Sequence, residues 1–253
     1  MLLYYNRINV LFTFRVITND SIGVDIMASV HDGHRKRLKE QFLSNGLKTF
    51  QPHNVLELLL FYAVPRQDTN EIAHILLSEY KTLSGVFNAP YEELLKTKGL
   101  GENGATLLKL VPQLLSVYSV DLSSNVPMNN VRTVCNYFQG CYIGVKVEQL
   151  RVCCLDDNLN IISCTVVQEG GVNAIPLNVR KIVEATYRSN CAMIILSHNH
   201  PNGLALPSGE DIKATRQLHN ILDRVGIKLL DHVIVGKTGA ISMKDSGYFN
   251  IFE

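Results

Sequence analysis

The chain has 253 residues, a formal net charge of +1, and 46% hydrophobic against 19% charged residues. This composition is ordinary for a globular protein with enough apolar material for a core, and a prior of about 150 residues per domain favours two domains. The charge excludes an overall basic field, so any contact with nucleic acid would need a local patch. No apolar run approaches the roughly 20 residues that span a bilayer. We therefore expect a cytoplasmic protein without membrane contact.

We do not expect the first 26 residues to be a signal peptide, because Arg7, Arg15 and Asp20 interrupt the apolar residues and no small-residue cleavage site is evident. We expect Met27 to be the natural start, and residues 1–26 to be a non-native or disordered extension.

The six cysteines lack the C-x-x-C spacing of a ribbon-type zinc site or a redox motif. We expect them to be reduced and mostly buried. Cys153 and Cys154 are adjacent in a strand-like run, so their side chains should point to opposite faces of a sheet.

Residues 27–120 predict a small all-α domain, since apolar residues recur at helical spacing between Gly, Pro and capping residues. Gly99-Leu100-Gly101 makes a tight turn into the last helix. The expected helices are a basic one from about His34 to Asn45, an apolar one over 54–63, one capped by Asp68 or Thr69, a short one at 90–95, and a last one through Ala105 and Leu115.

Residues 121–130 predict a linker, because Ser, Asn and Pro127 cluster there. From residue 131 to 253 the pattern changes to alternating strands and helices, which predicts an α/β (α+β) domain. The expected helices are capped by Asn178 and Ser208. The expected strands are 149–155, 159–167, 193–197, 227–235 and 240–243.

A segment with metal-ligand spacing follows the apolar strand at 193–197. His198 and His200 are two residues apart, so both imidazoles project from one face of the strand. A short loop then leads to a helix whose first turn contains Asp211. Two His and one carboxylate leave one tetrahedral position open, which is typical of a catalytic zinc site rather than a structural one.

Asp211 also has a purely structural interpretation. Ser208 and Asp211 have the spacing of a capping box, in which the carboxylate reaches back to the helix cap. Capping and metal binding would compete for the same carboxylate oxygens. The preceding H-x-H shifts the balance toward metal.

The string from His198-Asn199-His200-Pro201 to Asp211 resembles the JAMM (MPN+) metal motif. With Leu230-Asp231-His232, it is similar to the RadC family, which is historically labelled DNA repair. The helical domain resembles that family's N-terminal pattern as well, and only the first 26 residues fall outside the similarity. The resemblance implies a JAMM/MPN-like mixed sheet flanked by helices, of the cytidine-deaminase-like kind, after a helix-hairpin-helix-type domain.

The resemblance also implies one Zn²⁺ ion held by His198, His200 and Asp211, with Ser208 hydrogen-bonding a developing oxyanion. It implies hydrolysis of a peptide or isopeptide bond in a substrate that the sequence does not name, with a Glu as the general base for water. His232 is expected either to support a ligand or to be a satisfied core histidine.

Glu169 is the candidate base, because it ends an apolar strand just before Gly170-Gly171. The alternative is a solvated carboxylate in a turn. Glu148 and Glu184 fit less well, since one starts a strand and the other lies on a helix.

Gly99 and Gly101 resemble the turn of a helix-hairpin-helix module, whose amides can bind a DNA phosphate. The alternative is a tight connection that needs Gly for its backbone angles. The rival function is therefore a DNA-binding accessory protein whose zinc site is structural or nuclease-like. A third is an interaction module with a vestigial metal site.

Overall fold

The computed structural model describes residues 22–65, 67–170 and 178–248, with side chains from residue 33 onward. These residues form two compact units. One contains the chain up to Leu83 together with Lys96–Gly104, and the other contains Ser84–Leu95 together with the chain from Ala105 onward. Within the described ranges, no helix is both long and apolar enough to cross a bilayer.

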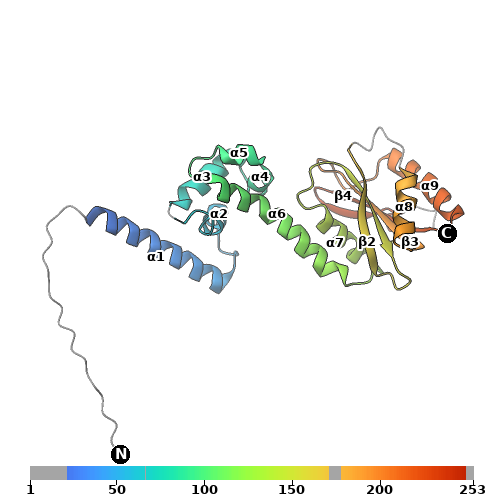
Figure 1. Ribbon diagram of the computed structural model, residues 1–253, viewed down its shortest axis with the longest axis horizontal. Coiled ribbons are helices and arrows are strands. Elements are labelled where there is room, and N and C mark those ends of the chain that lie inside the picture. The colour runs from blue at the N-terminus through green and yellow to red at the C-terminus, as the bar shows by residue number, and fades with distance from the viewer. Residues whose placement is uncertain (1–21, 66, 171–177, 249–253) are drawn as a thin grey trace, which may run out of the picture. The chain divides into compact units, whose positions relative to one another are not determined.

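Helices occupy the N-terminal half of the chain, as predicted (Figure 1). The first helix ends at Asn45, and Gly46 then adopts the left-handed φ of 63° that often ends helices. Asp68 caps the third helix, because its carboxylate accepts a hydrogen bond of 2.9 Å from the amide of Asn70. These helices are α1 (Ile22–Asn45), α2 (Pro52–Leu60), α3 (Thr69–Tyr80), α4 (Leu83–Asn88), α5 (Tyr91–Leu95) and α6 (Gly101–Ser124).

The end of α6 differs from the prediction, because the helix continues into the expected linker at 121–130. The helix ends only at Ser124, and the hydroxyls of Ser123 and Ser124 donate to carbonyls of its last turns, at 3.1 and 3.2 Å. The next helix, α7 (Val131–Cys141), was not predicted. Asn130 caps it by accepting a 2.9 Å hydrogen bond from the amide of Thr133.

The C-terminal part of the chain contains a five-stranded mixed sheet of order β2-β1-β3-β4-β5. β1 pairs antiparallel with β2 and β3, β3 pairs parallel with β4, and β4 pairs antiparallel with β5. The strands are β1 (Gln149–Leu155), β2 (Ile161–Glu169), β3 (Met193–Asn199), β4 (Lys228–Gly236) and β5 (Gly239–Ser242). This confirms the predicted α/β class, with an MPN-like mixed sheet flanked by helices.

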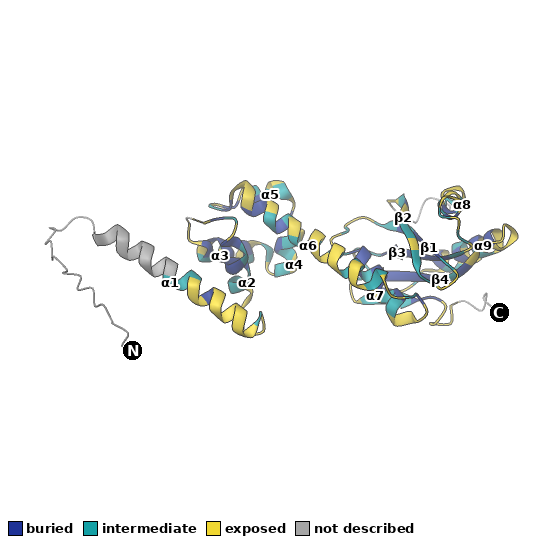
Figure 2. Cartoon of the chain, turned by 60° about the horizontal axis from the view of Figure 1, so that its bottom comes forward, coloured by how far each residue is buried: buried dark blue, intermediate teal, exposed yellow. Residues whose placement is uncertain are grey.

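Helices cover both faces of the sheet (Figures 1 and 2). On one face α7 packs its buried Phe138 into a core that includes Cys153. On the other face α8 (Val179–Arg188) and α9 (Gly209–Arg224) pack Ile182 and Leu222 into a core that includes Cys154. The adjacent cysteines therefore point to opposite faces, as predicted. Both cores are apolar, so they hold β3 rigidly between two helical layers.

Candidate metal centre

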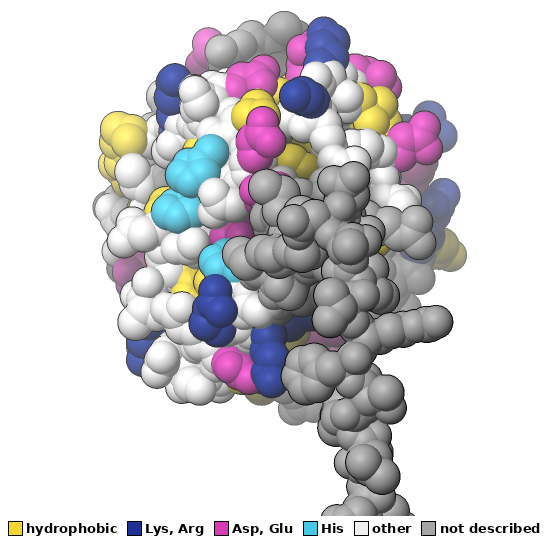
Figure 3. All heavy atoms as spheres, turned by 90° about the vertical axis from the view of Figure 1, so that its left-hand side faces the viewer, with side chains coloured by type: hydrophobic (Ala, Val, Ile, Leu, Met, Phe, Trp, Pro, Cys, Tyr) yellow, Lys and Arg dark blue, Asp and Glu magenta, His cyan; other side chains and the backbone are white. Residues whose placement is uncertain are grey.

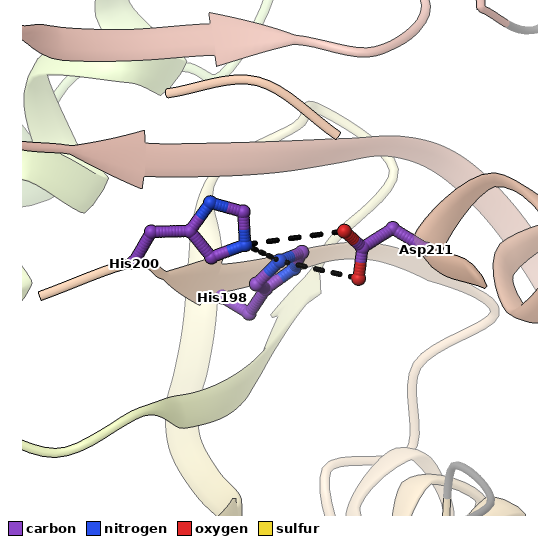
Figure 4. Close-up of side chains that lie close together, drawn as sticks. All are labelled: His198, His200 and Asp211. Carbon is purple, nitrogen blue, oxygen red and sulfur yellow. Dashed lines mark hydrogen bonds and ion pairs between the residues drawn. The ribbon is translucent and has the colours of Figure 1, made fainter. Parts of the chain in front are cut away.

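Three side chains with metal-ligating atoms converge where β3 ends and α9 begins (Figure 4). The Nε2 atoms of His198 and His200 are 2.9 Å apart. Asp211 presents Oδ1 at 3.4 Å from Nε2 of His198, and Oδ2 at 3.9 Å from Nε2 of His200. Within the described ranges, this is the one group of three or more His, Cys, Asp or Glu side chains close enough to hold a metal ion.

The loop after β3 determines which nitrogen of His200 faces the cluster. Nδ1 of His200 lies 3.0 Å from the carbonyl oxygen of Leu204. Because a carbonyl can only accept, Nδ1 carries the hydrogen, and Nε2 of the neutral ring has a free lone pair. The fit to a cation follows from this lone pair, which lies beside a carboxylate oxygen and a second imidazole nitrogen.

The same loop packs on the end of β4. The amide of His200 donates to the carbonyl of Val235 at 2.7 Å, and the amide of Lys237 donates to the carbonyl of Gly203 at 3.0 Å. Gly236 lies between these two bonds. A Cβ atom there would be 2.3 Å from the amide nitrogen of Ala205, so the close approach of loop and strand requires glycine.

Asp211 forms the predicted capping box while its carboxylate also faces the two histidines. Its Oδ2 accepts hydrogen bonds from the amide and the hydroxyl of Ser208, at 2.7 and 2.6 Å. The amide of Asp211 donates back to Ser208 Oγ at 3.1 Å, which completes the capping box. Oδ1 remains directed at His198. The capping hydrogen bonds therefore orient the Asp211 carboxylate and leave Oδ1 facing His198.

Burial favours the neutral form of His198. His198 is 1% exposed and Asp211 is 6% exposed. Burial lowers the pKa of His198 to about 4, although the carboxylates of Asp211 and Glu148 raise it. The imidazole is therefore uncharged near pH 7 and keeps a lone pair for a cation.

A pocket of about 390 Å³ opens beside His200, Ser208 and Asp211. Glu148 lies in its wall. The register of the sheet explains this position, because Leu150 of β1 pairs with His198 of β3 and the strands are antiparallel. Glu148 therefore reaches the level of His200. Glu148 thus lines the same pocket as His200 and Asp211, although it is distant from them in the sequence.

Glu169 lies elsewhere. It ends β2, which is separated from β3 by β1. Its side chain is exposed, and its Oε1 accepts a 2.6 Å hydrogen bond from Nε2 of Gln149. Glu169 is not among the residues that line the pocket. Glu184 lies on α8, where it pairs with Arg180 at 2.9 Å. Of Glu148, Glu169 and Glu184, only Glu148 lines the pocket.

The two glycines of the N-terminal turn both have left-handed backbones. Gly99 has a φ of 84°, and Gly101, the first residue of α6, has a φ of 63°. This backbone conformation is one that residues other than glycine rarely adopt, so the connection itself needs glycine. On the face in Figure 3, Lys and Arg side chains are interspersed with Asp and Glu. DNA contact through Gly99 and Gly101 stays a prediction.

Comparisons with known proteins agree with this fold. Residues 128–248 match the family described as a RadC-like JAB domain. A UPF0758 protein of Fusobacterium nucleatum, FN0909, is 32% identical over 225 residues, which cover 86% of this chain and 97% of that protein. The chain belongs to the RadC family. A second UPF0758 protein, SPO0054 of Ruegeria pomeroyi, is 31% identical over 223 residues, 88% of this RadC chain and all of that protein.

Membership of the RadC family covers most of the chain, so it extends to the helical N-terminal half. The segment that matches the RadC-like JAB domain contains the three candidate metal ligands and Glu148. The names of these relatives state no activity. The chemistry of this RadC protein must therefore be argued from its own site.

Proposed function

We propose that this RadC protein is a zinc-dependent hydrolase that cleaves a peptide or isopeptide bond. The observation that carries the proposal is the convergence of His198, His200 and Asp211 beside a pocket that also contains Glu148. Two His and one carboxylate are the ligands that zinc uses in catalytic sites, where a fourth position stays open. The same JAB fold and donor set support zinc over an oxygen-preferring cation.

His198, His200 and Asp211 would hold the ion. Zinc supplies Lewis-acid polarisation of a carbonyl and lowers the pKa of water to about 7 in typical catalytic sites. The chain contributes the geometry, because the Leu204 carbonyl orients His200 and Ser208 orients Asp211. Preorganised ligands reduce the entropy lost when the cation binds.

Glu148 takes the role of general base in this proposal, in place of Glu169. Its carboxylate accepts a proton from the attacking water as the C–O bond forms. When the C–N bond breaks, it returns that proton to the departing nitrogen. Glu148 is supported over Glu169 because it lines the pocket, whereas Glu169 is exposed and bonded to Gln149.

Asn199 positions Glu148 through the main chain. Asn199 is 3% exposed and lies between the two histidines. Its Oδ1 accepts from the amide of Gln149 at 2.7 Å, and its Nδ2 donates to the carbonyl of Val147 at 3.0 Å. The backbone is therefore held on both sides of Glu148. On the opposite edge of β1, the Glu148 carbonyl accepts from the amide of Gly170 at 2.9 Å.

Ser208 has a second role in the proposal. Ser208 lines the pocket, and its hydroxyl donates to Asp211. Rotation of this hydroxyl toward the substrate carbonyl would let it stabilise a developing oxyanion. The amide of Ser208 would still hold Asp211 Oδ2, so the ligand would keep one of its two hydrogen bonds.

The test is cleavage of a peptide and isopeptide library by the zinc-loaded full chain, read by mass spectrometry. Glu148→Gln should lower the cleavage rate by about 10²–10⁴-fold. Its zinc content should be unchanged. Glu169→Gln is the matched control, and it should keep the wild-type rate within about threefold, since surface changes away from a site are usually mild.

Two results would overturn the proposal. An absence of cleavage by zinc-loaded wild-type protein across both libraries would reject the hydrolase. A full cleavage rate in Glu148→Gln, with loss of activity in Glu169→Gln, would return the base to Glu169.

A further inference from the structure

The buried side of His198 continues into a chain of hydrogen bonds that leads away from the pocket. Nδ1 of His198 lies 2.9 Å from Nε2 of His232 on β4. Nδ1 of His232 lies 2.7 Å from the hydroxyl of Thr215 on α9. That hydroxyl donates to the carbonyl of Asp211 at 2.6 Å. This chain of hydrogen bonds therefore starts at His198 and ends at Asp211, which are both candidate metal ligands.

The residues of this hydrogen-bond chain are buried, and their burial limits the protonation states of the two histidines. Thr215 is 0% exposed and His232 is 2% exposed. A charged imidazolium that is fully removed from water is costly, so the neutral form of His232 is favoured. A neutral imidazole has one N–H and one bare nitrogen. Each histidine in the chain can then donate through only one of its nitrogens.

The direction of every bond follows from one fixed point, the carbonyl of Asp211. A carbonyl only accepts, so the single hydrogen of the Thr215 hydroxyl is used there. The hydroxyl oxygen must then accept from Nδ1–H of His232. Nε2 of His232 is consequently bare, and it accepts from Nδ1–H of His198. His198 is left with its lone pair on Nε2, the atom that faces His200 and Asp211.

We propose that Thr215 acts through His232 to set the tautomer of His198, so that Nε2 is presented to the metal. Thr215 and His232 are thus positioning residues, and neither touches the cation. The inference rests on the proposed zinc site, because the tautomer matters only if a cation binds there. The opposite tautomer would direct an N–H at the cation, which excludes coordination by that nitrogen.

The zinc affinity of Thr215 variants tests the chain of bonds. Thr215→Val removes the hydroxyl at similar volume, and it should weaken zinc binding by about 10–100-fold in a competition titration with a chelator. Thr215→Ser keeps the hydroxyl and should restore the affinity. Thr186→Val is the matched control, because Thr186 is also buried on a helix and donates to a helical carbonyl, at 2.7 Å, without contacting a histidine in the structure.

The tautomers themselves can be read from imidazole nitrogen shifts in the ¹⁵N-labelled wild-type protein, in the metal-free and zinc-loaded forms. Both His198 and His232 should carry hydrogen on Nδ1. A His232 that carries hydrogen on Nε2 would overturn the proposal, and so would wild-type zinc affinity in a folded Thr215→Val. If Thr215→Val fails to fold, the wild-type spectrum alone decides.

Failure of the zinc site and failure of the hydrogen-bond chain give different results. If the wild-type protein binds no zinc, the proposed function falls, whatever the tautomers are. If it binds zinc while His232 has the other tautomer, the proposed function stands and the role of Thr215 is rejected.

Discussion

The segment from β3 to α9 and the start of β1 both reach the pocket, but they are held in different ways. In the first segment, hydrogen bonds fix the ligand side chains themselves, since Ser208 donates twice to Asp211 and the Leu204 carbonyl accepts from His200. These bonds determine which ligand atom faces the cluster.

At the start of β1, by contrast, hydrogen bonds hold the main chain around Glu148. The side chain of Asn199 binds the backbone of Val147 and Gln149, and the Gly170 amide binds the Glu148 carbonyl. If the proposed function holds, metal affinity and proton transfer depend on separate contacts. Substitutions in the two regions should therefore have separable effects.

The largest effect is expected from removal of a ligand. Loss of a residue that only supports a metal ligand typically weakens metal binding by about 10–100-fold. His198→Ala removes a ligand itself, so it should weaken zinc binding by more than this. Cleavage should be lost with the metal, because the region at β1 alone cannot polarise the substrate. Metal content by elemental analysis after dialysis provides the measurement. Stoichiometric zinc in a folded His198→Ala would show that the cluster is not the metal site.

A smaller effect is expected from pH, through the buried imidazole of His198. The pKa of His198 is about 4 when folded, whereas a histidine in an unfolded chain has a pKa of about 6.5. The unfolded chain therefore binds more protons between these values, so this contribution to stability is complete above pH 6.5 and is lost as pH falls toward 4.

The metal-free protein should accordingly lose about 2 kcal/mol of unfolding free energy between about pH 7.5 and about pH 5, measured by urea denaturation. His198→Gln should weaken this dependence by the share of His198, because burial also lowers the pKa of His232, while replacement of His53 in the helical unit should leave it as in the wild type. An unchanged slope in His198→Gln would mean that other groups cause the acid sensitivity.

The smallest effect is expected from Asn199→Leu, which sharpens the contrast between the two regions. Loss of both bonds to the backbone should shift Glu148 and lower kcat by about 10-fold, since misplacement of a catalytic group by about 1 Å can cost as much as 10²-fold. Zinc affinity should stay within about threefold of wild type. Kinetics on a cleaved library member and a chelator titration give the two values.

Asn160→Ala is the control for this variant. Asn160 bonds Asp156 at the turn that leaves the other end of β1, so it tests general loosening of the strand. A parallel fall of kcat in both variants would remove the specific role of Asn199.

The ligand side of the site could be predicted from sequence because its residues are close together in the chain. The alternation of a strand places His198 and His200 on one face, and the helix cap at Ser208 fixes where Asp211 begins its helix. These are local rules, and the structure follows them.

The position of Glu148, the proposed general base, could not be predicted in the same way. Glu148 reaches the pocket only through the antiparallel register of β1 on β3, and no spacing within a segment encodes that register. Glu169 looked suitable because it ends an apolar strand, but that strand lies at the edge of the sheet. The unpredicted α7 has a different cause, since its cap Asn130 also fits the composition of a linker.

The contact between Gly236 and the ligand loop has a consequence for how variants of this protein should be interpreted. Any side chain at position 236 would push against Leu204 and Ala205, and Leu204 provides the carbonyl that orients His200. In a deep mutational scan, position 236 should therefore tolerate no replacement, although glycine has no side-chain chemistry to lose. Such a position would be mistaken for a catalytic one if loss of activity were the only measurement.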